Sequence, residues 1–367
     1  MHLVQGPMST TSSPRDPALA PADTVPDETL ITEMAPSTEG NLKILNVIET
    51  NSEVMCCRFS LDGGLLAVGL ASGIIKVYSP ETGRCIYSLS DQDTLKSHLP
   101  VTCIRWKAVS EGEDYANVLL ATYADGCVKH WHVTTSYCMS TIVEPLRQTL
   151  ACSFNDSFSQ FATAGSNTKI YLYDEKTKQL ITTLEPSSSH LVMDGHMSRV
   201  FTVKYIPEED HIFASAGWDD TVQFWDTRVD AKHSVRKIFG PHICGDALDI
   251  LPSNRKILTG SWRKNNTLQI WDYNTGKLIK DVPGDEIYSS MVCIIHLYCV
   301  QWQGPDGVLT GGSDKNIMRY MDQSTLHTMG RIVDLPRAVY TVDYDRHPLH
   351  PTFAAGTDNY IYLSKKI

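Results

Sequence analysis

The chain has 367 residues, of which 20% are charged, and a formal net charge of −10. This acidic balance disfavours a general nucleic-acid binder, and no apolar run is long enough to cross a membrane. Ten cysteines are scattered without a C-x-x-C pair, which fits a reducing compartment and predicts a cytoplasmic protein.

Residues 1–40 are rich in Pro, Ser, Thr and Ala and poor in aromatic residues. Such a segment cannot bury enough apolar surface to offset the entropy lost on ordering. We therefore predict a disordered N-terminal tail over 1–40, available to bind a second partner, and a single folded domain over 41–367.

One strand pattern returns seven times after the tail. Short apolar runs with small residues, such as Leu65–Gly69 and Phe161–Gly165, are each followed by a polar turn and a second strand. The spacing is close to the roughly 40–45 residues of a four-stranded repeat with loop insertions. The predicted first strands begin near Val54, Val101, Thr149, Val200, Ala247, Tyr298 and Val339.

The two ends of the repeat array complement each other. The last copy reaches Ser364 with three residues left, so it lacks a fourth strand, while Asn41–Ile48 reads as a spare strand before the first copy. Pairing these two segments would remove two open sheet edges at once. We expect the N-terminal strand to close the array into a ring.

The fourth copy carries the clearest motif, with His196, Ser215 and Asp219 preceding Trp225. The chain resembles the WD-repeat β-propellers over residues 41–367. The resemblance implies an all-β, seven-bladed β-propeller of four-stranded antiparallel blades, closed by the N-terminal strand. It also implies a structural role for these four side chains as a buried hydrogen-bonded set, in which Asp lies six residues before Trp.

Other copies keep part of this motif, and the resemblance implies the same structural role there. Copy two has Asp125 and Trp131, copy six has Asp314 with Tyr320 at the Trp position, and copy seven has Asp358 with Ser364 where the aromatic residue belongs. The remaining pairs are Ser72 with Tyr78, Asn167 with Tyr173, and Asn265 with Trp271.

Catalytic signatures are missing from the sequence. It contains no G-x-S-x-G, phosphate-loop, G-x-G-x-x-G or H-E-x-x-H motif. His347 and His350 are three residues apart, but adjacent prolines prevent the helix that would set them on one face. We predict a protein that is not an enzyme and that uses no cofactor or metal.

Three residues in neighbouring copies are candidates for binding a peptide or loop of another protein on one face of the ring. Trp218 precedes the turn Asp of copy four, and Trp262 occupies the matching place in copy five, followed by Arg263. Tryptophan and arginine are typical interface anchors. The alternative is that both tryptophans pack beneath neighbouring loops, because Trp is usually largely buried.

Two local resemblances suggest particular assemblies. The segments Phe239–Asp249 and Ile257–Arg263 look like a subgroup of WD-repeat proteins from ciliated organisms, which implies a cytoplasmic scaffold of ciliary or axonemal microtubules. The W-D-x-R sequence ending at Arg228 resembles the motif of substrate receptors for cullin-type ubiquitin ligases, in which the Arg binds an adaptor. We expect a non-catalytic interaction scaffold, with the ligase receptor as the alternative.

Overall fold

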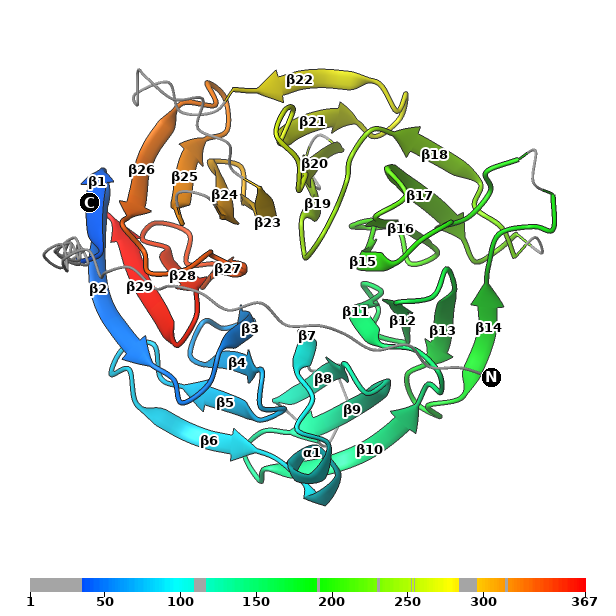
Figure 1. Cartoon of the computed structure of the whole chain (residues 1–367), viewed down its shortest axis with the longest axis horizontal. Helices are drawn as coiled ribbons and strands as arrows, with labels where there is room; N and C mark the ends of the chain where they lie inside the picture. Colours follow the sequence, from blue (N-terminus) through cyan, green and yellow to red (C-terminus); the bar gives the residue numbers. More distant parts are fainter. Residues whose placement is uncertain are drawn as a thin grey trace, which may run out of the picture. The chain divides into compact units, whose positions relative to one another are not determined.

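Seven antiparallel sheets surround a central axis in the computed structural model, each a blade of the ring (Figure 1). The structure describes residues 35–108, 117–189, 192–229, 232–251, 253, 255–283, 296–313 and 316–367. The seven-bladed β-propeller predicted from the repeats is therefore confirmed.

Each blade has four strands, numbered from the axis outward. The strands nearest the axis begin within two residues of the predicted starts: β3 (Val54–Phe59), β7 (Val101–Lys107), β11 (Thr149–Phe154), β15 (Val200–Tyr205), β19 (Leu248–Leu251), β23 (Leu297–Gln303) and β27 (Thr341–Tyr344). The second strands are β4 (Leu66–Leu70), β8 (Val118–Tyr123), β12 (Gln160–Gly165), β16 (Ile212–Gly217), β20 (Lys256–Gly260), β24 (Gly307–Gly312) and β28 (Thr352–Gly356).

The outer half of each blade follows the same order. The third strands are β5 (Ile75–Tyr78), β9 (Cys127–His132), β13 (Ile170–Asp174), β17 (Thr221–Asp226), β21 (Leu268–Asp272), β25 (Met318–Asp322) and β29 (Tyr360–Lys366). The outer strands are β6 (Cys85–Leu89), β10 (Tyr137–Val143), β14 (Leu180–Leu184), β18 (Arg236–Phe239), β22 (Leu278–Val282), β26 (Thr328–Val333) and β2 (Leu42–Glu49). A short helix, α1 (Gln92–Ser97), joins blades 1 and 2.

Blade 7 is built from both ends of the described chain. Strand β2 pairs antiparallel with β29, from Leu42 opposite Lys366 to Glu49 opposite Tyr360. This is the predicted closure, and it supplies the fourth strand that the last repeat lacks. The interlocking of the two ends means that the ring cannot open at this blade without breaking a full strand pair.

The folded part begins before the predicted boundary at residue 41. Residues Ser37–Gly40 form strand β1, which pairs with β26 as a fifth strand of blade 6. Glu39 explains the extension, because its carboxylate accepts from Nε of Arg331 at 2.5 Å. Residues 1–34 lie outside the described residues, so a disordered tail there stays a prediction.

The core lies between successive blades. Second and third strands are buried on both faces, as in β16 and β17, because each blade packs against a neighbour on either side. Trp131 and Trp225 are among the largest fully buried side chains. Burying a large apolar side chain contributes about 1.5–3 kcal/mol, so these inter-blade layers supply most of the stability. Within the described residues, no helix has the length and apolar character of a membrane span.

Candidate functional site

Blade 4 contains a hydrogen-bonded set that joins three of its segments. Nε1 of Trp225 donates to Oγ of Ser215 at 2.8 Å, and Ser215 lies 2.6 Å from Nε2 of His196. Nδ1 of His196 lies 2.8 Å from Asp219. Because the indole can only donate, Ser215 must pass its own proton to Nε2, which leaves Nδ1–H to donate to Asp219. This order satisfies every polar atom of the set.

The Asp219 carboxylate is held ionised although it is buried. Burial would raise the pKa of this carboxyl, but the hydrogen bond and charge of His196 lower it, together with bonds from Met197 N–H and Thr221. The carboxylate therefore fixes the turn between β16 and β17, including Trp218 next to it.

Blades 2 and 5 satisfy their tryptophans differently. Nε1 of Trp131 donates to the Tyr123 hydroxyl at 3.0 Å, whereas Nε1 of Trp271 donates to Thr259 Oγ1 at 2.9 Å. Asp125 accepts from the backbone N–H of Cys127 at 2.8 Å, which holds the turn of blade 2.

Blades 6 and 7 depart further from the motif. The predicted aromatic of blade 6 was wrong: Val308 pairs with Met321, as Phe213 pairs with Trp225 in blade 4, so Tyr320 lies one residue early. The partner Asp314 lies outside the described residues. In blade 7, Ser364 is buried with an unpaired hydroxyl, and Asp358 is half-buried with no side-chain hydrogen bond to any described residue.

The sheet registers place seven equivalent residues around the channel mouth. Val200 of blade 4 corresponds to Gly245 of blade 5, since Val203 and Leu248 pair with the equivalent Ser215 and Thr259. The next residue of each copy lines one cavity of about 280 Å³: Met55, Thr102, Leu150, Phe201, Asp246, Tyr298 and Tyr340. The mouth is thus mainly apolar and aromatic, with one carboxylate.

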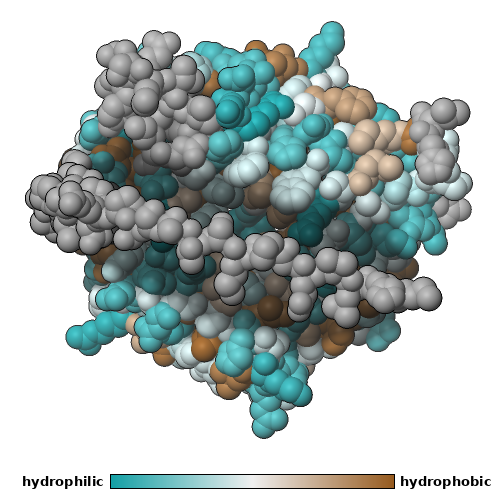
Figure 2. Space-filling model, in the orientation of Figure 1, coloured by the Kyte–Doolittle hydropathy of each residue, from teal (hydrophilic) through white to brown (hydrophobic). Residues whose placement is uncertain are grey.

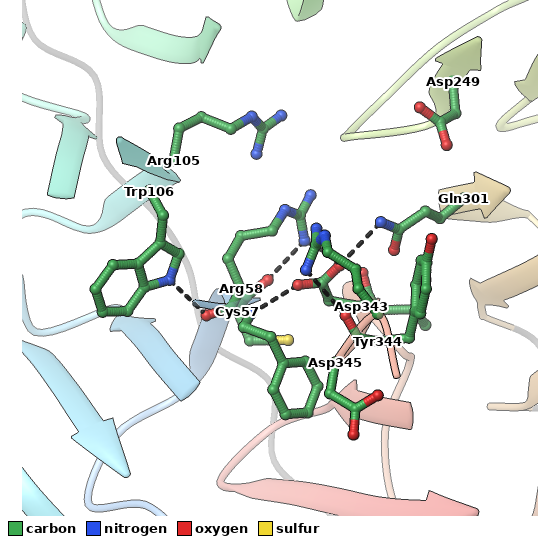
Figure 3. A network of polar contacts seen from close by, with 12 residues as sticks. Cys57, Arg58, Arg105, Trp106, Asp249, Gln301, Asp343, Tyr344 and Asp345 are labelled. Atoms are coloured by element: carbon green, nitrogen blue, oxygen red, sulfur yellow. Dashed lines mark hydrogen bonds and ion pairs between the residues drawn. The ribbon is translucent and has the colours of Figure 1, made fainter. Parts of the chain in front are cut away.

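Three residues further along each copy, a polar belt surrounds the axis. Figure 3 shows several of these side chains pointing inward from different strands, among them Arg58, Gln301 and Asp343. Gln301 donates to Asp343 at 2.9 Å, and Lys204 donates to Asp249 at 3.2 Å. The complete belt is Arg58, Arg105, Ser153, Lys204, Asp249, Gln301 and Asp343.

Asp246 joins distant blades across the channel. Its carboxylate accepts from Arg58 of blade 1 and, at 2.9 Å, from Arg105 of blade 2. Burial would raise the pKa of Asp246, but Arg105, Lys204 and Arg58 together hold it well below its usual range. Two guanidinium groups around one carboxylate leave the floor of the mouth with a positive excess.

Trp218 extends the apolar mouth toward the rim. Its ring lies 5.2 Å from that of Phe201, which lines the cavity, and it stacks on His242 with planes 7° apart. The side chain is 40% exposed. Of the two alternatives, partial packing with an accessible face describes this Trp: one side is held, and the rest meets solvent.

Trp262 lies next to Trp218 and is likewise 40% exposed. Its backbone N–H donates to the carbonyl of His242, the residue that stacks on Trp218, and its ring contacts that of His296. Arg263 is used within the fold instead. Its guanidinium donates to Gly240 O at 2.6 Å and to Gln269 at 3.1 Å, which braces the loop under Trp262.

Arg228 lies at the opposite end of β17 from Trp218, and hence toward the other face of the ring. Its guanidinium donates to both carboxylate oxygens of Asp226, at 2.9 and 2.7 Å, and this ion pair lowers the pKa of Asp226. The Arg228 side chain remains 56% exposed. Of the described residues, none form a cluster of His, Cys, Asp or Glu able to hold a metal ion.

Sequence reasoning missed the channel mouth because two repeats were aligned out of register. Blade 5 was counted from Ala247 and blade 6 from Tyr298, but the positions equivalent to Val200 are Gly245 and Leu297. Gly245 hid the repeat because no apolar side chain fits there: a Cβ would lie 2.2 Å from the carbonyl oxygen of Tyr298. Aligning the copies on their second strands would have revealed the ring.

Comparison with known proteins gives two family matches. Residues 41–109 match the model described as anaphase-promoting complex subunit 4 WD40 domain, and residues 187–226 match WD domain, G-beta repeat. The second match contains the whole His196–Trp225 set, and the first covers blade 1 together with its closing strand β2.

Curated relatives are distant and longer. The WD repeat-containing protein slp1 of Schizosaccharomyces pombe is 20% identical over 76% of this chain and 51% of its own length. The Periodic tryptophan protein 2 homolog of Dictyostelium discoideum is 23% identical over 73% of this chain and 28% of its own. A guanine nucleotide-binding protein subunit beta of Solanum tuberosum is 26% identical over 58% of this chain and 55% of its own. The chain thus spans about half or less of the first two relatives.

Proposed function

Because this chain belongs to the WD-repeat β-propeller family, we propose that it is a non-catalytic scaffold that binds other proteins through one face of the ring. The single observation that carries the proposal is a continuous aromatic surface. It runs from Trp262 through His242 and Trp218 to Phe201, and then into the channel mouth with Tyr298 and Tyr340.

The chemistry of this aromatic surface suits an extended peptide or a loop. The cavity of about 280 Å³ has room for one or two apolar side chains. Half-exposed tryptophans are frequent binding anchors because they bury a large area with few rotatable bonds. The propeller holds them in place before binding, which lowers the entropy lost in the complex.

The floor of the mouth adds a preference for charge. Arg58 and Arg105 outnumber Asp246 there, so an acidic group beside the apolar anchor would be favoured. We place the protein in a cytoplasmic assembly, with ciliary or axonemal microtubules as the setting that the sequence resemblance suggests.

Affinity purification with mass spectrometry tests this proposal. The wild-type protein is compared with Trp218→Ala/Trp262→Ala, and thermal melting confirms that the variant is folded. We expect the double variant to lose specific partners, because it removes both rim anchors. Retention of every partner by a folded double variant would sink the proposal.

The alternative function is a substrate receptor of a cullin-type ubiquitin ligase. It is supported by the exposed Arg228 at the end of the W-D-x-R sequence, on the face opposite the tryptophans. In the same purification, Arg228→Ala should lose a ligase adaptor if this function is correct. If no adaptor is found with either protein, the receptor function is excluded and the scaffold remains.

A further inference from the structure

The outer strands of the ring fall into two groups. On blades 4, 5 and 7 they carry charged residues, and on blade 6 the outer strand is covered by β1. On blades 1, 2 and 3 they carry none: Cys85–Leu89, Tyr137–Val143 and Leu180–Leu184 contain only apolar, Cys, Ser, Thr and Tyr residues. Charges on edge strands are a common means of preventing strand addition, and this sector lacks them.

Strand β10 of blade 2 is the longest of the three. Its seven residues alternate between exposed and half-buried, and the exposed set includes Tyr137, Met139 and Val143. Tyr137 and Val143 are 66% and 64% exposed, and Leu146 just beyond the strand is fully exposed. Figure 2 shows brown patches among teal along the lower rim, where blades 1 and 2 lie in Figure 1.

The backbone of β10 is open along its outer edge. The strand pairs with β9 on one side, and within the described residues it has no partner on the other. Glu144 N–H donates inward to Gly126 O, so by alternation the N–H groups of Thr141 and Val143 point outward. These groups form the row that another strand would need.

The same ring already accepts a strand at an equivalent edge. On blade 6, β1 adds to β26 as a fifth strand through four antiparallel residue pairs. Blade geometry is therefore compatible with strand addition, and β10 offers a longer edge than β26 uses.

We propose that β10 is a self-association edge, at which two copies of this chain pair antiparallel through their blade 2 outer strands. A two-fold arrangement centred on Ile142 sets Thr141 of each copy opposite Val143 of the other, so that the outward N–H groups meet outward carbonyls. It also brings the Leu146 end of one strand toward the Tyr137 end of the other.

Charge and size favour this occupant and set its strength. Each copy carries a net charge of −10, yet the paired strands bring no like charges together. A single strand pair buries less than the roughly 1,200 Å² of a standard interface, so the dimer should be weak and concentration-dependent. Dimerisation would leave the aromatic face of each ring free, which suits a scaffold that displays two binding faces.

Sedimentation analysis over a roughly hundredfold concentration range tests the inference. We expect the average mass of the wild type to rise with concentration. Val143→Pro, which removes one outward N–H, and Val143→Lys should remain monomeric. Two controls should associate like the wild type: Val143→Thr, which keeps the N–H, and Ile279→Lys on the already charged strand β22.

Several outcomes would overturn the inference. A wild type that stays monomeric at the highest concentration means that the edge is not used by a second copy. Association that persists in folded Val143→Pro and Val143→Lys, or that Ile279→Lys abolishes equally, assigns it to another surface. None of these outcomes bears on partner binding by the tryptophans, so the two proposals fail separately.

Discussion

Blades 4 and 7 are held together in opposite ways. Blade 4 is clamped from within, by a hydrogen-bonded chain from Trp225 through Ser215 and His196 to Asp219. Blade 7 lacks that chain, because Ser364 occupies the tryptophan position. Blade 7 is instead held by the exchanged strand β2. Local side-chain networks and strand exchange are thus alternative solutions to the same problem, which is to keep a four-stranded unit in a ring.

Removing residues 41–49 should have the largest effect, because it takes away the one device that holds blade 7. The deletion leaves β29 with an open edge and uncovers apolar residues of the last inter-blade layer. We expect loss of the cooperative unfolding transition in circular dichroism. A deletion variant that melts like the full chain would show that strand exchange is dispensable.

Breaking the blade 4 clamp should cost less than breaking the ring. Trp225→Ala removes a fully buried indole and leaves Ser215 without its donor, which should cost about 3–5 kcal/mol. Chemical denaturation measures the change. Trp271→Ala in blade 5, which loses one comparable hydrogen bond to Thr259, is the matched control for tryptophan removal without the His–Asp chain.

The bridge at Asp246 should contribute independently of either blade. Asp246→Asn leaves Arg58 and Arg105 without a counter-charge, at a cost of about 1–3 kcal/mol near neutral pH. Because the folded pKa of Asp246 is depressed, the carboxylate stabilises the fold above its unfolded pKa of about 4, and this stabilisation is lost as pH falls below that value. The difference between wild type and variant should therefore shrink on acidification; a constant difference down to acid pH contradicts the assignment.

The smallest effect is expected at Ser364 in blade 7. Its hydroxyl is buried without a partner, so Ser364→Ala removes an unsatisfied polar group. The variant should be as stable as the wild type or more stable by up to about 1 kcal/mol, whereas Ser215→Ala in blade 4 should be destabilising. Equal losses at both positions would remove the distinction between the two blades.

Much of the architecture was predictable because it repeats. Seven inner strands, the closing strand and the residues of the blade 4 set all follow from spacing along the chain. The channel mouth was not predicted, because Gly245 and Asp246 do not resemble the Val200–Phe201 pair to which they correspond. Strand β1 was missed because a four-residue polar segment has no strand pattern of its own, and the pairing depends on Arg331 from a distant repeat.

The residues of the candidate site separate in the same way. Trp218 and Trp262 could be found because they occupy matching places in neighbouring repeats. The role of Arg263 could not, because its hydrogen bonds run to Gly240 and Gln269, which only the folded loop brings together. A sequence pattern marks equivalent positions, but it does not say whether a charged group is directed inward.

The most direct test of the central claim is the affinity of one purified partner for channel-mouth variants. Phe201→Ala and Tyr340→Ala remove apolar surface from the mouth, whereas Arg228→Ala changes the opposite face. Calorimetric titration should show binding weakened about tenfold or more by either mouth variant, equivalent to about 1.4 kcal/mol, and unchanged by Arg228→Ala. If both mouth variants bind as tightly as wild type while Arg228→Ala does not, the binding face has been assigned to the wrong side of the ring.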